Sequence, residues 1–157
     1  MPLDAARFRQ TMGQLAAGVS VITVRTPDGG IGMTASSVSS LSLKPPLLLV
    51  CVGHEAAIRD TLLRAERFGV NVLAADQEAQ ARRFADRDLQ RLAAAELELS
   101  PGGVPVLGGT LARIECLRHG HFPAGDHVIV TGVLEWSEVR DGWPLCYFRG
   151  GYVGLKG

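Results

Sequence analysis

The sequence predicts a mainly β fold, a β-barrel with peripheral helices that is closed or split and whose strands run antiparallel. Three observations favour it. Short β-rich apolar runs outnumber helical segments, turn sequences that suit hairpins join most of them, and they do not alternate with helices as in a parallel doubly wound sheet. The 157 residues show neither a repeat nor a linker, so residues 1–157 are expected to form a single domain.

Three segments favour helices. Asp4 can cap the first one, which Gly18 ends. Spacings of four and three residues place three apolar side chains of this helix on one face: Phe8, Met12 and Leu15. A second helix is expected over residues 55–64, and a third runs from a cap at Asp76 to about Phe84.

Seven segments favour strands. Residues 19–24 and 31–42 flank a turn at 27–30, where proline presets φ and glycine accepts a positive φ, so these strands are expected to form a hairpin. Pro45 and Pro46 end the second strand because neither can donate to a strand ladder. The expected strands are residues 19–24, 31–42, 47–52, 68–73, 111–117, 127–136 and 144–148.

Composition limits the classes of partner. The 16 basic and 16 acidic residues leave no net charge and the basic residues are scattered, so neither nucleic acid nor a membrane is expected as a partner. The longest apolar run, residues 47–52, is expected to be a strand buried on both faces. It is far too short for a bilayer, which needs ~20 residues. High apolar content without net charge favours a homo-oligomer, in which another copy covers apolar surface.

Two features favour a cytoplasmic protein. The first residues have neither the basic nor the apolar region of a signal peptide. The three cysteines, Cys51, Cys116 and Cys146, are odd in number and lie in apolar runs. They are expected to be buried free thiols in a reducing compartment.

A hydroxyl-rich stretch stands out between Gly32 and Pro46. Six side chains in nine residues carry a hydroxyl group: Thr34, Ser36, Ser37, Ser39, Ser40 and Ser42. Serine is a poor strand former, so the stretch is either a ligand site that needs small hydrogen-bonding groups or a polar edge strand. Gly30 to Ala35 also fits the dinucleotide pattern G-x-G-x-x-G/A, but a strand-like segment follows where that site needs a helix, so we reject it.

Other candidate motifs carry less weight. Cys116 and three histidines lie close in sequence, but their spacing fits no structural zinc pattern and no metal site is expected. Cys51 lies in the most apolar strand, which disfavours a reactive thiolate. Asn71 is expected to be a buried amide whose partners are either backbone groups or the polar edge of a ligand. His127 follows Asp126 at a turn, where it is either a residue oriented at the barrel rim or an exposed histidine.

Taken in order, these segments resemble the short-chain flavin reductase family, the reductase components of two-component flavin-dependent monooxygenases. The resemblance runs from about Phe8 to Tyr152. It rests on Gly18-Val19, Gly32-Met33-Thr34-Ala35-Ser36-Ser37, Ser42-Leu43-Lys44-Pro45-Pro46-Leu47, Phe68-Gly69-Val70-Asn71-Val72-Leu73, Gln77, Phe84-Ala85, Glu115-Cys116, Gly125-Asp126-His127 and Tyr152.

The resemblance implies an FMN-binding split β-barrel of Greek-key-like antiparallel strands and a homodimer. It implies hydride transfer from C4 of NADH or NADPH to N5 of FMN or FAD, with reduced flavin passed to a separate monooxygenase. Such a reaction needs no nucleophile or general base on the protein. His127 would be the catalytic residue, facing the nicotinamide. The implied cofactor-binding residues are Thr34, Ala35, Ser36, Ser37, Cys51, Val52, Gly53, His54, Ala57, Asn71, Leu73, Gln77, Arg83, Phe84 and Tyr152.

Residues 53–58 depart from the family pattern. Members often carry a basic residue and hydroxyl groups after the strand expected at residues 47–52. Here His54 stands for the basic residue and Glu55 adds a negative charge. The departure motivates an alternative, a flavin-binding module on the same barrel that acts as a carrier, sensor or interaction subunit without reductase turnover.

Overall fold

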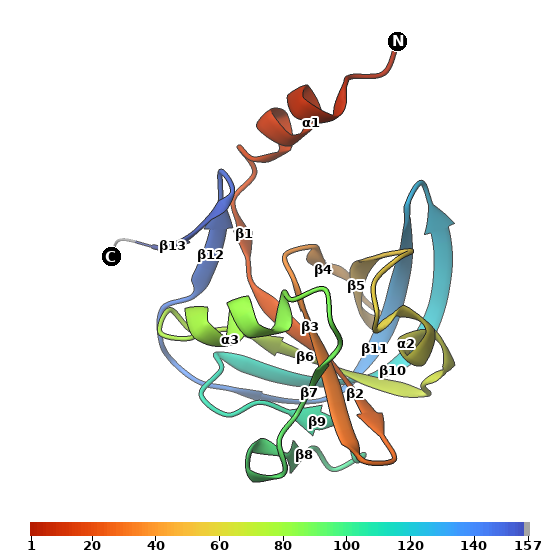
Figure 1. Ribbon diagram of the computed structural model, residues 1–157. Coiled ribbons are helices and arrows are strands. Elements are labelled where there is room, and N and C mark those ends of the chain that lie inside the picture. The colour runs from red at the N-terminus through yellow and green to blue at the C-terminus, as the bar shows by residue number, and fades with distance from the viewer. Residues whose placement is uncertain (156–157) are drawn as a thin grey trace.

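The core of the protein is an antiparallel sheet of eight strands that curls into a split barrel (Figure 1). The computed structural model describes residues 1–155. The strand order is β4-β5-β11-β10-β6-β2-β3-β7. These strands are β2 (Ser20–Thr26), β3 (Gly29–Ala35), β4 (Val38–Leu43), β5 (Pro46–Gly53), β6 (Arg67–Val72), β7 (Gln90–Arg91), β10 (Ala112–Ala124) and β11 (His127–Val139). The expected mainly β fold is therefore confirmed.

Two small sheets and short helices flank the barrel. One sheet joins β1 (Ala17–Gly18), β12 (Leu145–Phe148) and β13 (Gly151–Gly154), and the other joins β8 (Glu98–Leu99) and β9 (Pro105–Val106). The helices are α1 (Ala5–Met12), α2 (Arg59–Arg64), α3 (Glu78–Phe84) and a 3₁₀ turn (Ala94–Glu96). In Figure 1, α1 and the β12–β13 hairpin project away from the barrel. Within residues 1–155, no helix has the length and apolar character needed to cross a membrane.

Two apolar clusters form on opposite faces of β2. Successive side chains of a strand point to opposite faces, so Ile22 enters the cluster inside the barrel while Val21 enters a second cluster between the sheet and α3. Phe68 fills the barrel cluster, and Phe84 of α3 fills the second one; both rings are almost fully buried. The burial of Phe84 holds α3 against the sheet.

The first helix is shorter than expected. Asp4 caps it as predicted, because its Oδ1 accepts a hydrogen bond from the Arg7 N–H (2.8 Å). However, the helix ends at Met12, and Gly13 is its C-cap instead of Gly18. Residues 17–18 pair with β12 instead, since the backbone groups of an extended segment there find partners in the β12–β13 sheet.

Two expected strands also differ. The strand predicted over 31–42 is interrupted at Ser36 and Ser37, so β3 pairs with β2 while β4 pairs with β5. The strand predicted over 47–52 is not buried on both faces: β5 alternates buried and half-buried residues, because only one of its faces looks into the barrel. β13 was not anticipated, and α2 begins at Arg59 instead of Glu55.

The N-terminus of α3 is built differently from the prediction. Asp76 precedes the helix, but the N-cap is Gln77, whose Oε1 accepts from the Ala74 N–H (2.9 Å) and whose Nε2 donates to Gly108 O (2.9 Å). A longer, buried amide side chain reaches two loops at once, which a short exposed carboxylate at position 76 cannot do.

Candidate functional site

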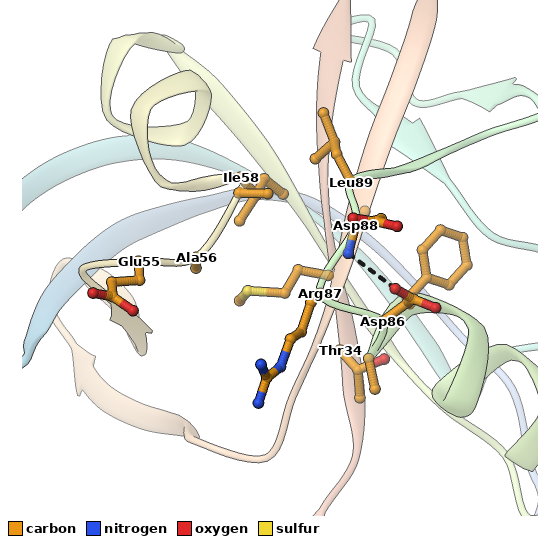
Figure 2. A pocket seen from close by; sticks show the side chains of 13 residues that line it. Thr34, Glu55, Ala56, Ile58, Asp86, Arg87, Asp88 and Leu89 are labelled. Carbon is orange, nitrogen blue, oxygen red and sulfur yellow. Dashed lines mark hydrogen bonds between the residues drawn. The ribbon is translucent and has the colours of Figure 1, made fainter.

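The largest pocket opens beside β3 (Figure 2). It has a volume of about 530 Å³ and is lined by three segments: residues 32–34 of β3, residues 55–58 between β5 and α2, and residues 84–89 at the end of α3 and beyond. The middle segment follows directly from the end of β5, and the last is held by α3. Elements distant in sequence therefore meet around one opening.

Close packing between Gly32 and Phe84 forms one wall of this pocket. A Cβ at position 32 would lie 2.8 Å from Phe84 Cδ1 and 3.1 Å from Val21 Cγ1. Carbon atoms pack favourably at roughly 3.5–4.0 Å. Only glycine allows the aromatic ring to lie this close to β3, and the ring thereby forms a rigid apolar wall.

A smaller hollow lies next to the pocket. Its volume is about 240 Å³, and it shares Thr34 and Ala85 with the larger pocket. Tyr152 and Tyr147 line it, with ring centroids 5.4 Å apart in an edge-to-face arrangement, and the Arg82 guanidinium lies 5.0 Å from the Tyr152 centroid. Burial raises the pKa of the Tyr152 hydroxyl, so Tyr152 is a neutral hydrogen-bonding group at pH 7.

The hydroxyl-rich stretch divides its residues between the pocket and the fold. Thr34 lines both the pocket and the hollow, and Ser36 lines the hollow. Ala35 between them points into the barrel core, as strand alternation requires. Ser37 lies outside both, where its hydroxyl donates to Cys51 O (2.9 Å) and accepts from the Cys51 N–H (3.3 Å). The stretch is thus part pocket lining and part strand.

Thr34 is already fixed by α3. Its hydroxyl donates to the backbone oxygen of Ala81 (2.6 Å), so only its lone pairs remain to accept a bond from a ligand. The bond also fixes the distance between β3 and α3, and with it the width of the pocket.

A second group of expected site residues gathers at the β10–β11 turn. The backbone N–H of His54 donates to the backbone oxygen of Asp126 (2.9 Å). The ring nitrogen Nε2 of His54 lies 3.0 Å from Gly125 O. His127 starts β11, pairs in register with Gly53, and places its Nδ1 2.7 Å from Asp126 Oδ1. That hydrogen bond is the main reason that the pKa of Asp126 is lowered. Both imidazoles lie where β5 leads into the pocket loop.

Asn71 makes all its hydrogen bonds inside the protein. Its Nδ2 donates to Val21 O (3.0 Å) and Thr23 Oγ1 (3.2 Å), and its Oδ1 accepts from the Leu107 N–H (2.9 Å). The residue is fully buried. Of the two partners that the sequence left open for it, the structure therefore shows protein groups, and Asn71 joins β6 to β2 and to the segment before β10.

Arg83 is likewise engaged by the protein. Its guanidinium grips the Glu96 carboxylate at two points (2.7 and 2.8 Å) and also donates to Arg91 O (2.6 Å). These bonds raise the pKa of Arg83 and lower that of Glu96. They tie α3 to the 3₁₀ turn and shape the loop that borders the pocket.

The expected site residues therefore fall into two sets. The pocket and the hollow bring together Thr34, Ser36, Ala57, Phe84 and Tyr152. The structure places the others outside both: Ala35, Ser37, Cys51, Val52, Gly53, His54, Asn71, Leu73, Gln77, Arg83 and His127.

The structure also adds pocket residues that the sequence did not single out. Met33 lines the pocket next to Thr34, and Arg87 lies in the loop after α3 (Figure 2). Met33 could have been found from its place in the glycine-to-serine stretch. The alternating charges of Asp86, Arg87 and Asp88 were the only signal for the loop.

The site suits a flat, partly polar ligand. Its volume lies within the roughly 300–1,000 Å³ usual for small-molecule pockets. Met33 provides apolar surface, with the buried Phe84 ring behind the wall, while Thr34 and Ser36 provide oxygen atoms. The hollow that shares Thr34 with the pocket and is lined by Tyr152 leaves room for a second group.

Comparison with known proteins gives the family. A model described as "Flavin reductase like domain" matches residues 12–156. FMN reductase (NADH) SmoA of Agrobacterium fabrum is 40% identical over 149 residues, covering 95% of this chain and 85% of that protein. HsaB of Rhodococcus jostii, the reductase subunit of a flavin-dependent monooxygenase, is 37% identical over 155 residues, covering 98% and 80%.

A solved structure agrees with these matches. The Streptomyces globisporus C-1027 NADH:FAD oxidoreductase SgcE6, in complex with NAD and FAD fragments, superposes with a TM-score of 0.92 at 33% identity, covering 98% of this chain and 93% of that one. The chain belongs to the flavin reductase-like family. The expected family, split-barrel fold and NAD(P)H:flavin oxidoreductase activity are confirmed, and the alternative of a module without turnover is not favoured.

Proposed function

We propose that the protein reduces FMN or FAD with NADH or NADPH and passes the reduced flavin to a separate monooxygenase. The observation that carries the proposal is a pair of pockets that share Thr34 and Ala85 in a chain of this family. When bound, flavin supplies the hydride acceptor, N5 of its ring. The protein then has to bind two planar groups in contact and to keep water away from them.

Each lining residue has a role in this proposal. Met33 covers apolar ring surface, Thr34 accepts hydrogen bonds at the ring edge, and Ser36 accepts or donates them. Tyr152 closes the far end of the hollow. His127, hydrogen-bonded to Asp126 at the β10–β11 turn and paired with Gly53 of β5, faces the nicotinamide from the rim and orients it in this proposal. Neither Tyr152 nor His127 needs to gain or lose a proton for hydride transfer.

The activity test uses purified protein under anaerobic conditions. NADH and NADPH are each mixed with riboflavin, FMN and FAD, and the absorbance of the nucleotide and of the flavin is followed. Loss of both absorbances is expected with at least one pair. Oxidation of neither nucleotide with any flavin would refute the proposal.

The role of His127 is tested separately. His127→Ala should slow hydride transfer or weaken nicotinamide binding more than it weakens flavin binding, measured by stopped-flow reduction and by flavin titration. The exposed strand residue His119 offers a matched control, and His119→Ala should change neither quantity. Equal loss of both in His127→Ala would contradict the assigned role.

We further propose a homodimer in which α1 packs on the partner copy. No residue of α1 is buried, and Phe8 and Met12 are 56% and 47% exposed. An eight-residue helix is marginal by itself in water, so it needs packing. Hydrogen bonds from Arg149 to Gly13 O and Gln14 Oε1 join the end of the helix to the β12–β13 hairpin. A second copy would cover this apolar face.

Light scattering coupled to size exclusion tests the homodimer. Wild type should elute with twice the chain mass, and the double variant Phe8→Glu, Met12→Glu should elute as a monomer. Val139→Glu, at an apolar residue that is 81% exposed elsewhere, is the control and should remain dimeric. A monomeric wild type, or a double variant that stays dimeric, would refute the arrangement.

The proposed compartment is the cytoplasm. Reduced nicotinamide nucleotides are available there, and the three free cysteines suit a reducing environment. Fractionation of cells that express the tagged chain would test this, and recovery in an exported fraction would contradict it.

A further inference from the structure

Charge is unevenly distributed around the pocket. Four of its lining side chains are ionisable: Glu55, Asp86, Arg87 and Asp88. Arg87 is thus the single cation among the lining residues within the described part of the chain. In Figure 2 its guanidinium projects into the open centre of the pocket, while Glu55 lies across the opening. An anionic ligand group in this pocket would find one positive partner.

The other arginines near the pocket are engaged elsewhere. Arg83 grips Glu96, Arg82 pairs with Glu78 at 3.5 Å and lies against Tyr152, and Arg59 pairs with Asp60 at 2.8 Å. By contrast, no hydrogen bond or ion pair joins the Arg87 side chain to any of residues 1–155. Its donors remain available to a ligand.

The loop keeps the neighbouring carboxylates from neutralising Arg87. Asp86 Oδ1 accepts from the Asp88 N–H (2.9 Å), which folds the loop tightly around residue 87. Figure 2 shows this bond on the side of the loop away from the guanidinium. Although Asp86 and Asp88 flank Arg87 in sequence, neither lies within ion-pair distance of it.

We propose that Arg87 recognises the phosphate group of the flavin and sets the preference of the enzyme for phosphorylated flavins. A guanidinium presents paired N–H donors that match phosphate oxygens, and such charge-assisted bonds are stronger than neutral ones. Glu55 opposes it with a negative charge from across the same pocket. The assignment rests on the proposed flavin reductase function and moves the flavin-binding arginine from Arg83, which Glu96 engages, to Arg87.

Riboflavin and FMN provide the discriminating pair of substrates, because they differ only by the phosphate group. Steady-state constants are measured for both with wild type, Arg87→Gln and Glu55→Gln. In Arg87→Gln the KM for FMN should rise about tenfold, equivalent to about 1.4 kcal/mol, while the KM and kcat for riboflavin stay unchanged. In Glu55→Gln the KM for FMN should fall severalfold, and riboflavin again should not respond.

Salt and a control variant complete the test. Added salt screens exposed charges, so it should raise the KM for FMN in wild type and have little effect in Arg87→Gln. Arg91→Gln is the matched control: Arg91 follows on the same segment, is exposed, and pairs with Asp28 outside the pocket. It should not change the ratio of the two KM values.

Two outcomes would overturn the inference. An equal rise in KM for both flavins in Arg87→Gln would assign Arg87 to loop structure, and no change for either flavin would remove it from the site. Both differ from failure of the proposed function, in which wild type itself would reduce no flavin. Thermal melting of each variant identifies misfolding. If Arg87→Gln is misfolded, Arg87→Lys is used in its place and should retain part of the FMN preference.

Discussion

A methyl group added at Gly32 should damage the flavin pocket by displacing Phe84. The new Cβ would lie 2.8 and 2.9 Å from two carbon atoms of the ring and 3.1 Å from Val21 Cγ1. Contact at about 3.5 Å requires a shift of roughly 0.7 Å. The ring is 1% exposed and Val21 fully buried, so neither can move into solvent. The strain must distort β3, α3 or both.

The cost follows from measured overpacking of cores. An extra methyl group in a close-packed site destabilises by about 1–3 kcal/mol, which in a domain of this size lowers Tm by roughly 2–4 °C per kcal/mol. For Gly32→Ala we therefore expect a fall of about 2–12 °C by thermal melting. The dissociation constant for FMN, from fluorescence titration, should rise because the displaced ring enters the pocket.

A double-mutant cycle tests the cause. Phe84→Leu removes the ring atoms that clash, so Gly32→Ala should cost much less in that background, with a coupling of about 1 kcal/mol or more. Gly108→Ala is the control, since a Cβ there meets no atom within 4 Å and its φ is not positive. If Gly32→Ala melted like wild type, or if its cost were unchanged by Phe84→Leu, the packing argument would be wrong.

Two further predictions concern groups that support the barrel. Burial raises the pKa of the Cys116 thiol to about 12, so the thiol should stay protonated at pH 8. Iodoacetamide should therefore label Cys116 only in denaturant and not in the folded protein, as measured by mass spectrometry. The hydrogen bond from Arg83 lowers the pKa of Glu96 below its ordinary 4.5, so this pair stabilises the fold above that pH and the contribution disappears as the pH falls through the lowered value. Arg83→Gln should therefore cost up to about 1 kcal/mol at pH 7, and urea unfolding should show the gap from wild type closing in acid; a constant gap would contradict the pairing.

The barrel could be predicted because its signals are local. Turn residues such as Pro27 to Gly30 specify a hairpin without reference to the rest of the chain, and Asp4 caps its own helix. The sequence-based predictions fail where a distant element determines the local structure. Residues 17–18 extend because β12 offers them partners, and the 31–42 run breaks at Ser36–Ser37 because β4 pairs with β5 and not with β2.

The site was less predictable, because position in a motif does not say where a side chain points. Thr34 and Ser36 reach the cleft while Ala35 enters the core, a consequence of strand alternation that could have been applied in advance. Arg83 and Arg87 could not have been told apart in this way. Which of them is neutralised depends on Glu96, thirteen residues beyond Arg83, and on how the intervening loop folds.

Residues that the resemblance assigned to flavin therefore include several that build the pocket without lining it. Asn71 fixes β6 to β2, Gln77 starts α3, and Arg83 closes the loop after it. Substitution at any of them would move a pocket wall and weaken flavin binding, so weaker binding alone cannot prove contact. A contact residue should discriminate between ligands that differ at one group, whereas a scaffold residue should affect all flavins alike and lower Tm as well. By that criterion Asn71→Ala should weaken riboflavin and FMN binding equally, measured by fluorescence titration, and unequal weakening would return Asn71 to the site.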